Sequence, residues 1–267
     1  MKLFKLASTV ALMAAVSAHA APVLYDQNVT PGVIFGSGVS NGGFTVDKNQ
    51  GVELGLRGKL RHNAAGAPEN TFNSNGDGTY SFAAGSAFGQ SANTAVWSFE
   101  WSVNTDLPAE GQGRVLGDLR YELGLDDDAS LGTNFSVFDP IKGGNPGLGG
   151  TVCWDHSTGS NLTNASSDEI ANCAGATAAA DYALLLSANN VAQNSWKPHW
   201  FMPGFDPTVD GTYSLFLAAY DVNGIVARTD IQIIVGNGGA AQVPEPASLA
   251  LAGLALLGLT AARRRKV

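Results

Sequence analysis

The chain has 267 residues, of which 33 are Gly, 2 are Cys and only 14% are charged. This apolar, charge-poor composition excludes an intrinsically disordered chain and a coiled coil, both of which are rich in charged residues. The formal net charge of −8 argues against nucleic acid as a partner, because nucleic-acid-binding domains carry clustered positive charge. The part between residues 21 and 242 is more acidic still, with 9 basic and 22 acidic residues.

Residues 1–20 have the features of an export signal. Lys2 and Lys5 form a basic start, and an apolar stretch at 6–17 has the length of a signal-peptide core. Small residues precede the expected cleavage site, which lies between Ala20 and Ala21. We therefore expect a cleavable signal helix and an exported mature protein.

The C-terminal residues 243–267 contain three successive parts. Pro244-Glu245-Pro246 comes first, and its prolines cannot enter a helix interior. The apolar run at 249–262 predicts a short transmembrane helix, although a full span needs about 20 residues. The run is followed by a basic cluster that the positive-inside rule keeps on the cytoplasmic side, made of Arg263, Arg264 and Arg265.

This order of parts resembles the PEP-CTERM sorting signal of Gram-negative bacteria, a segment also described as an ice-binding protein C-terminal domain. The resemblance implies recognition by an exosortase, which is a membrane cysteine protease. It also implies transient insertion in the inner membrane, followed by cleavage near the motif and delivery to the cell surface or the medium, as other transient hydrophobic tails are removed. In the resembling family, such sorting accompanies exopolysaccharide production.

The region 21–242 is expected to form a single all-β domain, an antiparallel β-sandwich of immunoglobulin-like or jelly-roll-like type. Apolar and polar residues alternate at 52–61, 95–104, 115–125 and 225–235, which is the period of β-strands. In antiparallel sheets this alternation is typical of strands with one face on the core and one in water. We therefore expect half-buried strands.

The string Asp-Gly-Thr-Tyr-Ser occurs twice, at 77–81 and at 210–214. The second copy leads to Asn223-Gly224, a hairpin signal, and this part resembles the final strand pair of bacterial immunoglobulin-like sandwiches. Two unrelated strands that use the same favourable turn explain the repeat equally well, so one or two sandwich units remain open. The Ala-rich stretch 174–186 predicts one short helix.

The chain has only two cysteines, Cys153 and Cys173, which lie 20 positions apart. In an exported protein this pair predicts one disulfide. A metal site is the weaker alternative, because two thiols without paired histidines leave the ligand set incomplete.

The sequence predicts no catalytic residue, and we expect that the protein is not an enzyme. Ser40 lies in a Gly-x-Ser-x-Gly pattern, but that motif needs a following helix, and the next residues read as a strand. His62, His156 and His199 lack the spacing of zinc hydrolases. A secreted hydrolase is the least favoured alternative.

Three adjacent acids, Asp126, Asp127 and Asp128, form a candidate calcium site. Their mutual repulsion would be relieved by a hard cation, whereas the alternative is a solvated loop. No other cofactor is expected.

Arg57, Lys59 and Arg61 alternate along one expected strand and therefore share a face. Two interpretations are open. The stripe pairs with acids such as Glu100 on neighbouring strands, or it is unpaired and binds an anionic exopolysaccharide.

Trp196 and Trp200 either stack on sugar rings or pack inside the protein. Together with the sorting signal, these patterns predict a cell-surface or extracellular-matrix protein with a structural or adhesive role in the exopolysaccharide or biofilm matrix. The alternative is a carbohydrate- or ice-binding module, although a regular Thr ladder is missing from the sequence.

Overall fold

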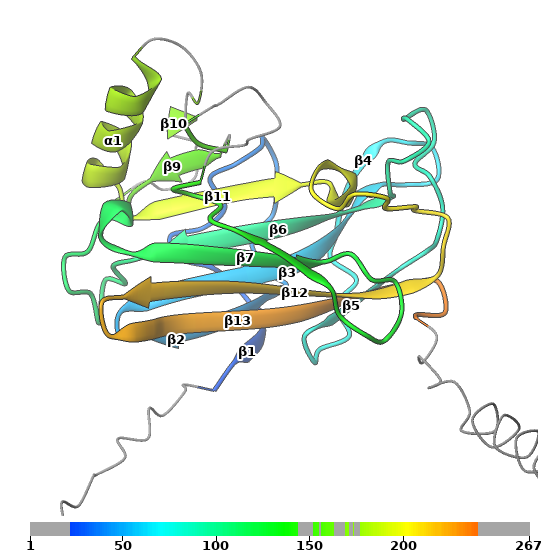
Figure 1. Cartoon of the computed structure of the whole chain (residues 1–267), viewed down its shortest axis with the longest axis horizontal. Coiled ribbons are helices and arrows are strands. Elements are labelled where there is room, and N and C mark those ends of the chain that lie inside the picture. The colour runs from blue at the N-terminus through cyan, green and yellow to red at the C-terminus, as the bar shows by residue number, and fades with distance from the viewer. Residues whose placement is uncertain are drawn as a thin grey trace, which may run out of the picture.

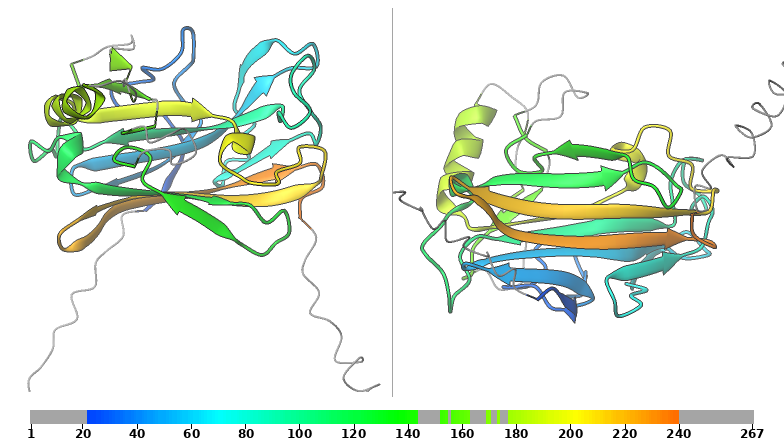
Figure 2. Two further views of the ribbon diagram at one scale, coloured as in Figure 1. Left: turned by 45° about the horizontal axis from the view of Figure 1, so that its top comes forward. Right: turned by 60° about the horizontal axis from the view of Figure 1, so that its bottom comes forward.

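The computed structural model describes residues 22–143, 152–154, 156–162, 169–170, 173 and 177–239, and these form two β-sheets packed face to face (Figures 1 and 2). The expected cleavage site at Ala20 and Ala21 and the whole C-terminal signal lie outside them. No helix in these ranges is long and apolar enough to cross a membrane.

The larger sheet, sheet A, has the strand order β1-β2-β3-β6-β11-β9-β10, and β4 pairs with β3 beside this path. Its strands are β1 (Leu24–Gln27), β2 (Phe44–Asn49), β3 (Val52–His62), β4 (Pro68–Thr71), β6 (Trp97–Asn104), β9 (Ser157–Gly159), β10 (Glu169–Ile170) and β11 (Val191–Trp196). All pairs in this sheet are antiparallel.

The smaller sheet, sheet B, has the order β5-β13-β12-β7-β8. Its strands are β5 (Thr79–Phe82), β7 (Arg120–Asp126), β8 (Phe135–Phe138), β12 (Gly211–Asp221) and β13 (Gly224–Val235). The predicted all-β, antiparallel architecture is confirmed, with one departure: β5 and β13 run parallel.

The hairpin expected near Asn223-Gly224 is formed by β12 and β13. Asp221 Oδ1 accepts a hydrogen bond from the Asn223 amide at 2.7 Å, and Gly224 has a φ of +131°, which favours glycine. The two Asp-Gly-Thr-Tyr-Ser copies lead into β5 and β12, which lie on opposite sides of β13.

The main hydrophobic core lies between the two sheets and contains large side chains from both. Sheet A contributes Trp97, Phe99 and Trp101, and sheet B contributes Tyr121 and Ile233, all almost completely buried. Burial of such aromatic and branched side chains is the dominant favourable term in folding.

The expected half-burial is wrong for the centre of sheet A, because every residue of β6 and most of β3 are buried. Residues 28–43, between β1 and β2, cross the outer face of this sheet, and we call them the strap. The strap contributes three apolar side chains to that face, Val29, Ile34 and Phe35, each at most 5% exposed. The polar face of the strands is therefore covered by chain and not by water.

Polar side chains of sheet A satisfy the backbone of the strap. Glu53 Oε1 accepts from the Thr30 amide at 2.6 Å, and Asn104 Nδ2 donates to the Thr30 carbonyl at 2.9 Å. Gln193 accepts from the Ile34 amide and donates to the Gly32 carbonyl, both at 2.9 Å. A buried loop needs such partners because unpaired backbone groups are costly.

The predicted short helix is present as α1 (Ala178–Ala188), a few residues later than expected. Two 3-10 turns, η1 (Leu116–Asp118) and η3 (Pro198–Trp200), accompany it.

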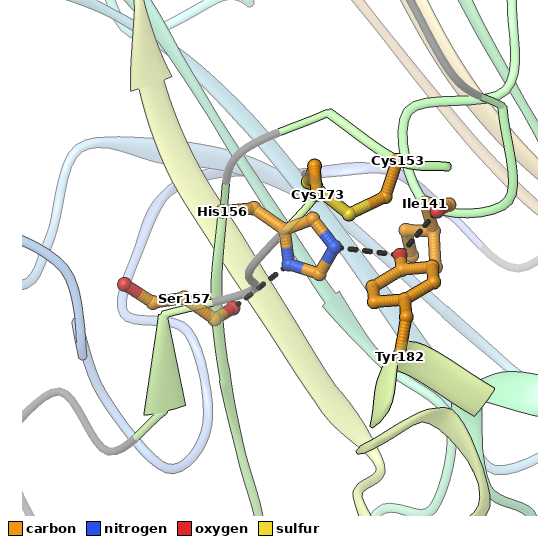
Figure 3. The surroundings of a disulfide bond; sticks show 6 residues. All are labelled: Ile141, Cys153, His156, Ser157, Cys173 and Tyr182. Atoms are coloured by element: carbon orange, nitrogen blue, oxygen red, sulfur yellow. Dashed lines mark hydrogen bonds between the residues drawn. A yellow bond between two sulfur atoms is a disulfide. The ribbon is translucent and has the colours of Figure 1, made fainter. Parts of the chain in front are cut away.

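The predicted disulfide is present, since Cys153 and Cys173 are bonded to each other (Figure 3). Beside it, the His156 Nε2 atom lies 2.8 Å from the Tyr182 hydroxyl, which links the segment before β9 to α1. Burial lowers the pKa of His156 to about 4, so this histidine is neutral at neutral pH.

Candidate functional site: a cationic pocket on sheet A

A pocket of about 190 Å³ opens on the outer face of sheet A, and we call it the cationic pocket. Its lining combines three basic side chains, three small polar side chains, one tryptophan and part of the strap. The residues are Phe35, Gly36, Val39, Lys59, Arg61, Ser98, Asn194, Ser195, Lys197 and Trp200. Pockets for drug-sized ligands hold about 300–1,000 Å³, so this one fits a single small group.

Five parts of the fold position this lining. Lys59 and Arg61 alternate on β3, Ser98 lies opposite Lys59 on the neighbouring strand β6, and Ser195 belongs to β11. The hydroxyls of Ser98 and Ser195 are 3.2 Å apart across the β6–β11 pair. The strap forms one wall, and η3 carries Trp200 over the other.

Lys59 is held at the base of the pocket by a buried ion-pair triad. Its Nζ is 2.6 Å from Glu100 Oε1, and Arg57 Nε donates to Glu100 Oε2 at 2.6 Å. Both cations share this one carboxylate, so the triad has a net charge of +1. Burial lowers the pKa of Lys59, and the Glu100 carboxylate opposes that effect.

Arg61 and Lys197 add two further charges to the pocket. Neither forms an ion pair with a carboxylate in the described part of the chain. Burial lowers the pKa of Lys197, and the neighbouring Arg61 lowers it further. A bound anion would relieve this repulsion, which makes the pocket an anion-binding arrangement inside a strongly acidic body.

Trp200 gives the pocket an exposed aromatic face, because 55% of the residue is accessible. The Lys197 Nζ lies 5.8 Å from the centre of this ring, within the range of a cation–π contact. An amphipathic ring beside cations and hydroxyls is suited to a ligand that has both an apolar face and an acidic group.

Two histidines lie beside these cations without a complete set of hydrogen bonds. His62 Nε2 and His199 Nδ1 are buried and have no partner among the described residues. Burial and the nearby Lys197 lower the pKa of both histidines. At neutral pH they are therefore uncharged and add no positive charge to the pocket.

The residues predicted to contact sugars fall into two groups in the structure, one that is buried and one that lines the cationic pocket. Arg57 and Lys59 pair with Glu100, as the interpretation of a cross-strand ladder expected, and Arg57 is fully buried. The expectation that Arg57 and Trp196 contact a polymer is wrong, because the strap covers Arg57 and Trp196 is 4% exposed, packed 5.1 Å from the Trp101 ring.

Arg61 and Trp200 are brought together in the cationic pocket, with the end of Lys59 beneath them. The sequence analysis did not predict Lys197 as part of a binding site, although this residue lies between Trp196 and Trp200. The sequence feature that could have indicated Lys197 is its position inside an aromatic cluster, in a chain with few basic residues.

The aspartates at 126–128 accept hydrogen bonds from neighbouring backbone and side-chain groups. Asp126 Oδ1 accepts from the Asn134 amide at 2.7 Å, and Asp127 Oδ1 accepts from the Asn134 side chain at the same distance. Asp128 Oδ1 accepts from the Ser130 amide. These carboxylates accept hydrogen bonds within the turn between β7 and β8, and calcium binding by them stays a prediction. No group of three metal-ligating side chains occurs in the described ranges.

Ser40 lies in the strap and not in a strand–turn–helix elbow. Its carbonyl accepts from Arg57 Nη1 at 3.0 Å, so this residue helps to hold the strap on sheet A.

The fold and the pocket define a class, an all-β sandwich protein with a pocket lined by basic side chains on one outer face. Residues 242–266 match the family model described as the PEP-CTERM protein-sorting motif, which confirms the resemblance found in the sequence. The motif implies recognition by an exosortase, export and an extracellular or surface location. Neither the curated proteins nor the solved structures contain a match to this chain.

Proposed function

We propose that this exported protein acts in the extracellular matrix as an adhesive, non-enzymatic component that binds acidic polysaccharide through the cationic pocket. The observation that carries the proposal is the gathering of Lys59, Arg61 and Lys197 in one pocket. These are 3 of only 9 basic residues in the body, and Arg61 and Lys197 lack acidic partners in the described structure.

The size of the pocket supports one acidic group at a time. In this proposal a carboxylate enters between Arg61 and Lys197, while the sugar ring that carries it stacks on Trp200. A single contact of this kind is weak, but a polymer that presents many acidic groups to many protein molecules gains by multivalency.

The test is binding of the exported protein to immobilised polygalacturonate, with neutral dextran as the reference polymer. We expect binding to polygalacturonate alone. Binding should weaken as ionic strength rises from about 0.01 M to about 0.15 M, because the Debye length falls from about 30 Å to about 8 Å.

An Arg61→Ser, Lys197→Ser variant should lose this binding. The matched control is Arg114→Ser, Arg120→Ser, which removes the same charge from positions outside the pocket lining. Equal losses in both variants would show a general charge effect, and either that result or a parent protein that fails to bind polygalacturonate contradicts the proposal.

A further inference from the structure

A second concavity lies on the outer face of sheet B, on the opposite side of the sandwich from the cationic pocket. Its volume is about 440 Å³, which lies within the range of small-ligand sites. Most lining residues come from both edges and the centre of sheet B, with Tyr25 added by β1 of sheet A, and we call this site the sheet B groove. Three features of the groove indicate which ligand it fits: a polar floor, an aromatic ring at each end, and charged side chains that are paired within the protein.

The floor is a row of polar side chains that crosses three strands. Thr79 on β5 pairs with Gln232 on β13, and Gln232 pairs with Ser214 on β12. Adjacent strands lie about 4.8 Å apart, so the row presents hydroxyl and amide groups at regular steps across the sheet. Together these three side chains offer both donors and acceptors.

An aromatic ring stands at each end of this floor. Tyr25 of β1 is 42% exposed, and Phe135 of β8, at the far edge of sheet B, is 39% exposed. Gly78 leaves space for the tyrosine, because a Cβ at this position would come within 2.9 Å of Tyr25 Cε1. Phe135 packs edge-on against Phe216 with ring centres 5.2 Å apart.

The charged groups of the groove are already paired within the protein. The Arg228 guanidinium donates to both oxygens of Asp230, with Nε at 2.9 Å from Oδ2 and Nη2 at 2.6 Å from Oδ1. Asp77 Oδ1 accepts from the Thr79 amide at 3.0 Å and from its hydroxyl at 2.7 Å. One cation and two carboxylates leave the groove slightly negative, which disfavours an acidic ligand.

We propose that the sheet B groove binds an uncharged oligosaccharide. Tyr25 and Phe135 provide flat apolar faces for sugar rings, while Thr79, Gln232 and Ser214 hydrogen-bond to sugar hydroxyls between them. The inference does not rest on the function proposed for the cationic pocket, since the two linings share no residue.

The experiment is isothermal titration of the exported protein with four neutral hexasaccharides, derived from cellulose, laminarin, starch and xylan. We expect at least one to bind, with an affinity that is unchanged by ionic strength. A Tyr25→Ala, Phe135→Ala variant should lose about tenfold or more in affinity, as expected from two lost aromatic contacts. A Gln232→Ala variant should lose about two- to tenfold through its hydrogen bonds.

The matched control is Phe88→Ala, Leu184→Ala, which removes two exposed apolar side chains outside both the groove and the cationic pocket and should bind as the parent does. The Arg61→Ser, Lys197→Ser variant should also retain the neutral ligand, so failure of one proposal is distinguished from failure of the other. The inference is overturned if no hexasaccharide binds, if the control variant loses as much affinity as the groove variant, or if polygalacturonate displaces the neutral ligand.

Discussion

In the described part of the chain, Glu100 is the one carboxylate that pairs with two buried cations on the outer face of sheet A. It pairs with Arg57 and Lys59, and the Arg57 guanidinium lies between the rings of Phe44 and Phe72, each centred 4.0 Å away. Such a triad is tolerated because its charges are hydrogen-bonded to each other and to the strap.

Removal of the Glu100 charge should therefore destabilise the folded protein. We expect Glu100→Gln to lower the free energy of unfolding by about 3–5 kcal/mol, because two buried cations lose their counter-charge. Urea denaturation measures this difference. The control is Glu122→Gln, whose partner Arg120 is 57% exposed, and which should cost no more than about 1 kcal/mol. Similar small losses in both variants would show that the triad is not a stabilising unit.

His156 is a second buried titratable group, and it should make stability depend on pH. Its pKa is lowered to about 4 in the folded protein, chiefly by burial, against about 6.5 in the unfolded chain. Between these values the unfolded chain binds a proton that the folded protein does not. Stability is therefore complete above about pH 6.5 and falls as the pH drops towards 4, by roughly 3 kcal/mol in total.

The measurement is the free energy of unfolding of the parent and of His156→Gln at about pH 7 and about pH 4.5. The variant should be less stable at pH 7, because it loses the contact with Tyr182, but its stability should fall less between the two pH values. His199→Gln is the comparison: the pKa of His199 is also lowered, but this residue is less buried, so its loss should change the slope less than the loss of His156 does. Parallel curves for the parent and His156→Gln would refute this role.

At the scale of elements, periodicity in the sequence predicted the strands well. The alternations at 52–61 and 95–104 correspond to β3 and β6, with their apolar residues in the core as expected. The strap was not predictable, because residues 28–43 have no regular pattern and reach partners far away in sequence. Ile34, for example, is bonded to Gln193, 159 positions later.

The dependence on contacts between distant residues also explains which residues of the cationic pocket the sequence predicted and which it did not. Alternation correctly placed Arg57, Lys59 and Arg61 on one face, but their exposure depends on where the strap lies. Lys197 joins them only because β11 pairs with β6, and strand spacing alone does not specify that pairing.

The disulfide ties the segment before β9 to the chain that leads into α1. Cys153 is buried against Tyr182 of that helix. Closing a loop between cysteines 20 positions apart contributes roughly 3 kcal/mol in the chain-entropy model, so reduction should lower the free energy of unfolding by about that amount.

Urea denaturation with and without a reductant measures this contribution. A Cys153→Ser, Cys173→Ser variant should match the reduced parent and should not respond to the reductant. Alkylation of the native protein without prior reduction would show that the two thiols are free and would contradict the bond.

At the scale of the whole molecule, the sorting motif makes a prediction about the mature chain. The surface form should lack residues 249–267, because transient hydrophobic tails of sorting signals are removed and residues 242–266 match such a signal. A Pro244→Ala, Glu245→Ala, Pro246→Ala variant should keep the tail and remain with the membrane fraction. The measurement is the intact mass of the surface form, and a complete C-terminus there would exclude processing.

The two proposed binding sites lie on opposite outer faces of the sandwich, one on sheet A and one on sheet B. If both proposals hold, a molecule built in this way would join an acidic polymer on one side to a neutral polymer on the other. Because the mature body is itself acidic, the localised positive charge of the cationic pocket also limits where an acidic polymer can approach.

The position of β13 has a mechanical consequence. This strand ends at Val235, only a few residues before the sorting motif, and it is hydrogen-bonded to β12 on one side and to β5 on the other. A pull on the C-terminal segment therefore acts along a strand that is paired on both sides over residues 232–235, and it loads those hydrogen bonds together, in shear. Pulling on β8, an edge strand, would peel its bonds one after another, so tension applied through β13 is resisted better than tension applied through β8.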